Sequence, residues 1–169
     1  MPKLIFFSLL VLLTACNNPT TTDTVAETKK INATVDAWHN AAAHADFNNY
    51  FQYLTEDAVF IGTDATENWH KKEFAAFSKP YFDKGKAWNF TPLERHIFFD
   101  KTGQTAWFDE LLNTQMKICR GSGVLTNIAG EWKINQYVLS MTMPNDKIVD
   151  VLKLKTVEED SIINKLQKK

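Results

Sequence analysis

The sequence predicts an α+β domain in which helices come first and a curved sheet follows. Apolar residues recur at spacings of three and four from residue 31 to residue 45, which is typical of a helix with one buried stripe. Extended runs separated by tight turns fill residues 88 to 142, which favours an antiparallel sheet. Helices and strands that are grouped in this way, rather than alternating, indicate the α+β class.

Two further helices are predicted before the sheet. Asp46 suits the N-cap of a short second helix, because its side chain can accept a hydrogen bond from a free backbone N–H. Residues 58–61 form a short β-like run that Gly62 closes. Residues 71–79 suit a third helix, which we expect Pro80 to end because proline cannot donate a backbone hydrogen bond.

The second half of the chain predicts four strands and one last helix. The strands are expected at residues 88–99, 105–114, 117–128 and 132–142, with a glycine in the turn between the first two. Residues 147–168 are charged, with apolar residues at helical spacing, and predict a C-terminal helix.

The first sixteen residues carry the features of an export signal. Lys3 gives a positive start, and Leu4 to Leu13 form an apolar run too short to span a bilayer. The run ends in Leu-Thr-Ala-Cys, which resembles the lipobox of bacterial lipoproteins. The resemblance implies cleavage before Cys16 and acylation of that residue, and hence a stable lipid anchor. The alternative is an ordinary signal peptide with an accidental cysteine.

These patterns predict a division of the chain into a signal peptide at 1–15, a flexible tether at 16–30, one folded domain at 31–145 and a C-terminal helical extension at 146–169. The resemblance to a lipobox implies a location at the bacterial cell envelope, in the periplasm or at the outer membrane. The formal net charge of −1 gives no field that would favour nucleic acid.

Several blocks of the predicted domain are familiar in order and spacing. They are Ala-Trp-His-Asn at 37–40, Ala-Asp at 45–46, Glu-Asp-Ala-Val-Phe-Ile-Gly-Thr-Asp at 56–64, Glu-Asn-Trp at 67–69, Ala-Trp-Phe at 106–108, Arg-Gly-Ser-Gly-Val-Leu at 120–125 and Trp-Lys-Ile at 132–134. Together they resemble the SnoaL-like branch of the nuclear transport factor two-like superfamily. The resemblance implies a cystatin-like cone, in which a curved antiparallel sheet wraps around N-terminal helices and leaves a pocket in its mouth. It also implies a homodimer paired through the sheet, but it fixes no function.

The ketosteroid isomerase branch of this superfamily can be compared position by position. Its catalytic carboxylate falls at Gly62, its oxyanion-binding tyrosine at Val35 and its second oxyanion donor near Gly123. None of these residues can do that chemistry, which needs a base and an oxyanion donor in one pocket. That isomerase mechanism is therefore not expected.

The strands carry polar groups that could face the pocket. Alternation puts Trp107 and Asp109 on one face of their strand, Arg120 on one face of the next, and Gln136 on one face of the last. If these faces are concave, an Asp109–Arg120 pair would line an apolar mouth together with Trp107 and Gln136. The alternative is a cross-strand ion pair on the outer face.

Other candidates lie on the helices and loops. Trp38, His39, Trp69 and Trp88 could line the pocket, although most such aromatic residues are simply core. Asp64 could act as a base, or could stabilise a turn.

Two residue types give no clear site. His39 and His44 are five residues apart and form no recognisable metal signature, so no metal and no cofactor are expected. Cys119 has no evident His-Asp partner and is interpreted as a small strand residue rather than a nucleophile.

Two hypotheses on function follow. The first is a lipid-anchored, non-catalytic module that binds a small apolar or amphipathic ligand in its cone. The alternative is a lyase or isomerase acting on a carbonyl compound, with Asp109 or Asp64 as base and Arg120 as anion stabiliser. The partners expected are the small ligand, the membrane through the anchor and a second copy of the chain.

Overall fold

The computed structural model describes residues 23–168 of the 169-residue chain. The predicted signal peptide and Cys16 lie outside the described residues. Within 23–168 no helix is both long and apolar enough to cross a membrane.

The chain forms four α-helices, one short 3₁₀ helix and six strands among its described residues. In order they are α1 (Thr24–Ala43), α2 (Phe47–Gln52), β1 (Leu54–Ile61), β2 (Asn68–His70), α3 (Lys71–Asp83), β3 (Thr91–Phe99), β4 (Thr105–Thr114), β5 (Lys117–Ile128), β6 (Glu131–Met141), η1 (Asn145–Lys147) and α4 (Ile148–Gln167).

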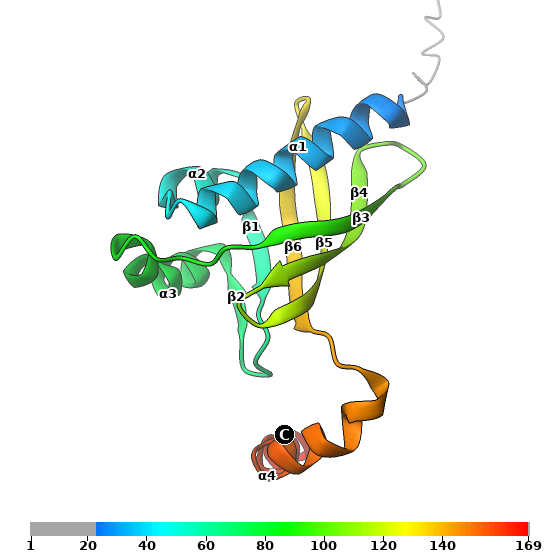
Figure 1. Ribbon diagram of the computed structural model, residues 1–169. Helices are drawn as coiled ribbons and strands as arrows, with labels where there is room; N and C mark the ends of the chain where they lie inside the picture. Colours follow the sequence, from blue (N-terminus) through cyan, green and yellow to red (C-terminus); the bar gives the residue numbers. More distant parts are fainter. Residues whose placement is uncertain (1–22, 169) are drawn as a thin grey trace, which may run out of the picture.

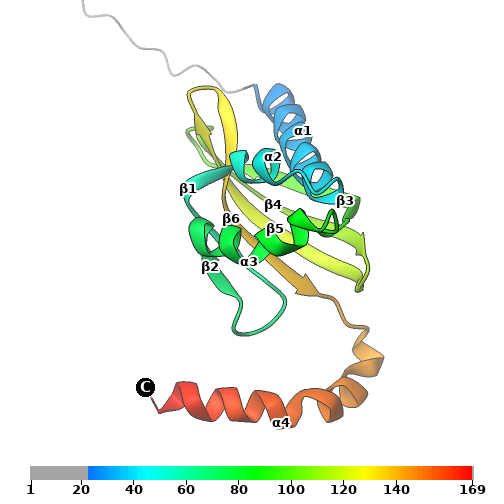
Figure 2. The same ribbon diagram turned by 90° about the vertical axis from the view of Figure 1, so that its left-hand side faces the viewer.

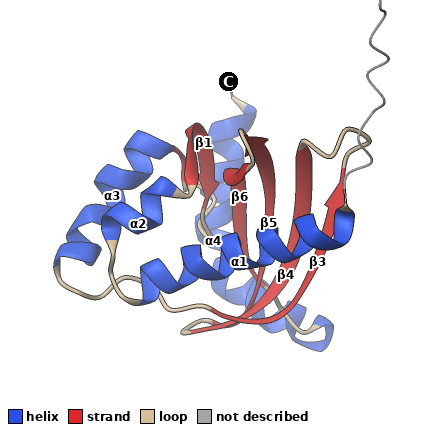
Figure 3. Cartoon of the chain, turned by 90° about the horizontal axis from the view of Figure 1, so that it is seen from above, coloured by secondary structure: helices blue, strands red, loops and turns tan. Residues whose placement is uncertain are grey.

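The six strands make one curved, open sheet in the order β2-β1-β6-β5-β4-β3. Helices α1, α2 and α3 lie on one side of this sheet, as Figure 3 shows from above. The α+β prediction is confirmed, with one difference: the sheet is mixed, because β1 runs parallel to β6. The chain reaches β6 only after crossing the whole sheet, so the last strand can lie beside the first.

Helices α1 and α3 both extend beyond their predicted bounds. Helix α1 begins at Thr24, so residues 24–30 are helical rather than part of a tether, and the Asp23 carboxylate caps the helix by accepting from Val25 N at 3.1 Å. Helix α3 continues through Pro80 to Asp83. Proline removes one hydrogen bond but its φ suits a helix, and the buried Phe82 packs the last turn against the core.

Helix α4 stands apart from the cone. Figures 1 and 2 show it joined to β6 only through the short η1 segment. None of its residues is buried, and apolar side chains such as Leu154 and Val157 are largely exposed. The fold that positions a site therefore ends at β6.

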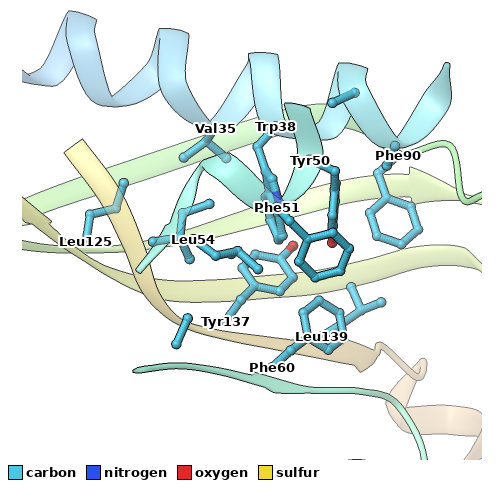
Figure 4. Close-up of a cluster of buried hydrophobic side chains, with 14 of the residues drawn as sticks. Val35, Trp38, Tyr50, Phe51, Leu54, Phe60, Phe90, Leu125, Tyr137 and Leu139 are labelled. Carbon is cyan, nitrogen blue, oxygen red and sulfur yellow. The ribbon is translucent and has the colours of Figure 1, made fainter. Parts of the chain in front are cut away.

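Aromatic rings fill the space between the helices and the sheet (Figure 4). Trp38 of α1 stacks on Tyr50 of α2 with ring centroids 5.1 Å apart, and meets Tyr137 of β6 edge-on at 4.7 Å. All three are buried. Packed aromatic pairs of this kind stabilise a core beyond the area they bury, so they fix α1 and α2 on the sheet.

Glycines on the inner face of β5 make room for large side chains on β4. Gly123 lies opposite Phe108 in the strand register, and Gly121 lies opposite Glu110. A Cβ at position 123 would stand 2.6 Å from Phe108 Cε1 and 2.8 Å from the backbone oxygen of Gln136. Neither position can therefore carry a side chain without movement of its neighbours.

We expect Gly123→Ala to lower the free energy of unfolding by about 1–3 kcal/mol, because overpacking a tight site forces neighbouring atoms apart. Urea denaturation measures this change. Ser122→Ala, on the opposite face of the same strand, is the matched control and should change stability by less than about 1 kcal/mol. Equal stability of Gly123→Ala and wild type would contradict tight packing at position 123.

Candidate functional site

One pocket opens at the end of the cone where α3, the β1–β2 loop and the β4–β5 turn meet. It has a volume of about 210 Å³. We call it the aromatic pocket, and its lining residues are Phe60, Gly62, Thr63, Glu67, Trp69, Phe74, Phe77, Trp88, Phe90, Gln115, Met116 and Leu139. Six of these are aromatic, so the pocket suits the apolar part of a ligand.

The rings of the aromatic pocket support one another. Phe60 of β1 and Phe74 of α3 stack with centroids 3.9 Å apart, and Trp69 of β2 stacks on Phe77 of α3 at 4.4 Å. Trp88, from the segment before β3, stacks on Phe74 at 5.7 Å. Because each ring is held by another, the walls are formed before any ligand binds.

Glu67 is the one charged residue in this lining. Its Oε2 accepts a hydrogen bond from the backbone N–H of Asp64 at 3.1 Å. The carboxylate packs against the α-carbon of Gly62, since a Cβ there would lie 2.9 Å from Glu67 Cδ and still closer to its Oε2. The absence of a side chain at position 62 thus leaves the space that Glu67 occupies.

The sequence analysis did not identify Glu67 as a site residue. A signal was present: Glu67 and Trp69 are two residues apart, and side chains at that spacing share a face of an extended segment. Gly62 has no carboxylate of its own, and the carboxylate beside it comes from Glu67, five residues further along the chain.

A second group of polar residues lies inside the cone and is centred on Glu110 of β4, which is fully buried. Its Oε1 lies 2.8 Å from His39 Nε2 and accepts from the Tyr137 hydroxyl at 2.9 Å. Its Oε2 accepts from Arg95 Nη2 at 2.8 Å and from Arg95 Nε at 3.0 Å. Arg95 also donates to Asp36 Oδ1 at 2.9 Å. We call Glu110, His39, Tyr137 and Arg95 the Glu110 cluster.

The Glu110 cluster holds a buried anion. Burial raises the pKa of Glu110, but the hydrogen bond and charge of His39 and the charge of Arg95 outweigh it, so the pKa lies below its ordinary value. Burial raises the pKa of Tyr137 well above its ordinary value, and the Glu110 carboxylate raises it further. Glu110 is therefore ionised and Tyr137 protonated at neutral pH, and the cluster joins α1 to three strands.

The predicted tryptophans of the helices and loops, and His39, fall into two places. Trp69 and Trp88 come together in the aromatic pocket. Trp38 and His39 do not line it, because both are buried between α1 and the sheet. Phe90 lies beside His39, with ring centroids 5.8 Å apart, and lines both the aromatic pocket and a shallow groove over His39.

The sheet faces that carry Trp107, Asp109, Arg120 and Gln136 are the outer ones, so the pocket hypothesis for these residues is wrong and the alternative of an outer face holds. On β4 the buried residues are Ala106, Phe108, Glu110, Leu112 and Thr114, so Trp107 and Asp109 point away from the helices. Arg120 and Gln136 lie on the same outer side. Both phases of the β4 alternation contain large apolar residues, which is why the sequence pattern did not identify the buried one.

Asp109 makes its contacts on that outer face. It lies 3.7 Å from Arg120 Nη1 and 3.2 Å from His96 Nδ1, and Arg120 is half exposed. The alternative of a cross-strand ion pair on the outer face is thus the geometry observed. Trp107 stacks on Phe98 there, with both rings about half exposed. Pairing of two copies through the sheet stays a prediction, and these rings lie where the second copy would pack.

The Asp64 carboxylate makes its hydrogen bonds within its own loop. It accepts from the Thr66 hydroxyl at 2.6 Å and from Thr66 N at 2.8 Å, and these hydrogen bonds lower its pKa.

Cys119 is buried, with its Sγ 3.5 Å from the Thr114 hydroxyl. Among residues 23–168, no three His, Cys, Asp or Glu side chains gather where they could hold a metal ion.

Comparison with known proteins identifies this architecture. Residues 31–144 match the sequence model of the SnoaL-like domain. A search of the curated proteins found no significant match.

Solved structures share the fold at low sequence identity. An NTF2-like protein of unknown function from Pseudomonas putida KT2440 is 14% identical, with a TM-score of 0.61, over 74% of this chain and 92% of that one. A protein from Streptomyces avermitilis, proposed to be a dehydratase of the NTF2-like family, is 12% identical, with a TM-score of 0.62, over 72% and 99%. The association domain of Caenorhabditis elegans CaMKII is 17% identical, with a TM-score of 0.57, over 69% and 97%. These similarities show the fold alone.

The raised pKa of Tyr137 predicts a loss of stability in alkali. An unfolded tyrosine releases its proton near pH 10.0, whereas folded Tyr137 keeps it, so rising pH favours the unfolded state. We expect the free energy of unfolding to fall above pH 10 by up to about 1.4 kcal/mol per pH unit for this one residue.

Denaturant melts of wild type and Tyr137→Phe between pH 8 and pH 12 measure the effect. The slope should be smaller in Tyr137→Phe, while the contribution of buried Tyr50, whose pKa burial also raises, is present in both proteins and cancels. Parallel curves for the two proteins would contradict a protonated, buried Tyr137.

Proposed function

The chain belongs to the SnoaL-like domain family, and we propose that its cone binds a small apolar or amphipathic ligand in the aromatic pocket without transforming it. The observation that carries the proposal is the pocket itself: six aromatic side chains enclose about 210 Å³ beside a single carboxylate. An apolar cavity with few polar groups is the usual form of a small-molecule site.

The placement of the two predicted bases, Asp109 and Asp64, favours binding over catalysis, because neither lines the aromatic pocket. Asp109 lies on the outer face of the sheet, and the hydrogen bonds that Asp64 accepts stay within its own loop. Glu110 is ionised, but all its close partners belong to the Glu110 cluster. None of the three is placed to take a proton from a molecule in the aromatic pocket, so the alternative of a lyase or isomerase loses the bases predicted for it.

The proposal includes a lipid anchor at Cys16 on a bacterial envelope membrane. Its support is the sequence: Lys3, the apolar run that follows and Ala15-Cys16 stand in the order that lipoproteins use. Acylation at that residue would keep the aromatic pocket close to a membrane, where amphipathic molecules are concentrated.

We expect the protein purified from its own host to carry a bound small molecule, seen by native mass spectrometry as an added mass released on unfolding. Thr63→Trp should abolish this mass, because Thr63 is exposed and lines the pocket, where an indole fills the mouth without disturbing the core. Ala65→Trp is the matched control, since Ala65 is exposed in the same loop but does not line the pocket. Added mass that survives Thr63→Trp would place the ligand elsewhere.

The anchor has its own test. Cells grown with an alkyne-bearing fatty acid should label the wild-type protein and leave Cys16→Ser unlabelled. An unlabelled wild type, or equal labelling of both proteins, would refute the anchor while leaving the pocket proposal intact.

A further inference from the structure

We propose that the aromatic pocket selects a cation: an apolar body that carries a protonated amine or a quaternary ammonium group. This inference rests on the proposed function and names the ligand class for the same pocket. Its first support is the charge of the lining, which contains Glu67 but no lysine, arginine, histidine or aspartate. An anionic ligand would meet the charge of Glu67 there and no cationic side chain.

The carboxylate of Glu67 has no cationic partner among residues 23–168. No Lys, Arg or His nitrogen lies within 4.0 Å of it, in contrast to Glu110, which meets His39 and Arg95. Its Oε2 accepts one backbone hydrogen bond, from Asp64 N, and its Oε1 accepts none within the described part of the chain. Glu67 is half-buried, so a neutral apolar ligand that displaced its water would leave a carboxylate poorly solvated, at a cost to binding.

The aromatic walls add to the same preference. Aromatic faces attract cations through their quadrupole, most strongly those of tryptophan, and two tryptophans, Trp69 and Trp88, line this pocket. A quaternary ammonium group loses less hydration free energy in such a site than a small inorganic cation does, because its charge is spread over its alkyl carbons. A carboxylate at the edge of an aromatic enclosure therefore fits an organic cation.

The backbone fixes Glu67 in this position. Gly62 N–H donates to the backbone oxygen of Glu67 at 3.0 Å, and Glu67 N–H donates to the backbone oxygen of Asp64 at 3.0 Å. These bonds close the β1–β2 loop, and Gly62 supplies the space that the carboxylate fills. A charge that is already in place does not have to be ordered when the ligand binds.

Binding can be followed at a single methyl group inside the pocket. Met116 lines the aromatic pocket, whereas Met141 and Met143 do not. In protein labelled with ¹³C-methyl methionine, the Met116 resonance reports occupancy, and the Met141 and Met143 resonances serve as internal controls. The probes are phenyltrimethylammonium and its neutral isostere tert-butylbenzene.

We expect phenyltrimethylammonium to bind about tenfold more tightly than tert-butylbenzene, from cation–π attraction together with the Glu67 charge. Glu67→Gln should remove most of this ratio, because it weakens the binding of phenyltrimethylammonium and relieves the desolvation cost that tert-butylbenzene meets at the carboxylate. Glu131→Gln is the matched control, because it removes the same charge from a residue that does not line the pocket, and it should keep the ratio.

The outcomes separate this inference from the function on which it rests. Equal affinities in wild type would overturn the cation proposal and leave ligand binding standing. A tenfold ratio that survives Glu67→Gln would overturn the part of the proposal that assigns the selection to Glu67. If neither probe moves the Met116 resonance, the proposed pocket function itself fails.

Discussion

The buried carboxylate of Glu110 is the constraint on which the arrangement of the cone depends. A charge without solvent is costly unless hydrogen bonds replace the water, and here His39, Tyr137 and Arg95 supply four contacts at 2.8–3.0 Å. Because these donors come from α1, β3 and β6, the carboxylate on β4 is satisfied only when all four elements are in place. Removing one partner of such a group is expected to cost about 3–5 kcal/mol. The cluster thus requires one packing of helix on sheet, whereas apolar contacts alone would allow several.

Two glycines matter here for the space they leave empty. Gly121 faces Glu110 and Tyr137, and a Cβ at that position would stand 2.9 Å from Glu110 Cγ. Gly62 leaves the space that the Glu67 carboxylate fills. In both cases a missing side chain makes room for an acidic side chain, from the neighbouring strand β4 at Gly121 and from the same β1–β2 loop at Gly62. At these two glycine positions the nearest acidic group therefore belongs to a different residue of the chain.

Much of the fold could be predicted from the sequence, because helical spacing and strand alternation are local signals. The bounds of β4 and β5 match their predicted residues, and Asp46 caps α2 as expected. Local signals could not predict which of the two faces of β4 is buried. Trp107 and Phe108 are adjacent and both large, so either could face inward, and only the partners brought by α1 and β3 decide that Glu110 is buried and Asp109 exposed. The pocket residue Glu67 was also not predicted, because it lies in a loop. The shape of that loop depends on its hydrogen bonds, which leave no periodic pattern in the sequence.

Two walls of the aromatic pocket differ in how they are held: one contacts the Glu110 cluster, and the other belongs to the edge of the sheet. Leu139 lies two residues from Tyr137 on the inner face of β6, and Phe90 packs on His39, so both are tied to the Glu110 cluster. The opposite wall is the β1–β2 hairpin, whose strand β2 is three residues long and lies at the edge of the sheet. Short edge segments open at a small fraction of the free energy that global unfolding requires. Backbone amides of the hairpin are therefore expected to exchange with solvent faster than those of β4, β5 and β6, each of which is paired with a strand on both sides.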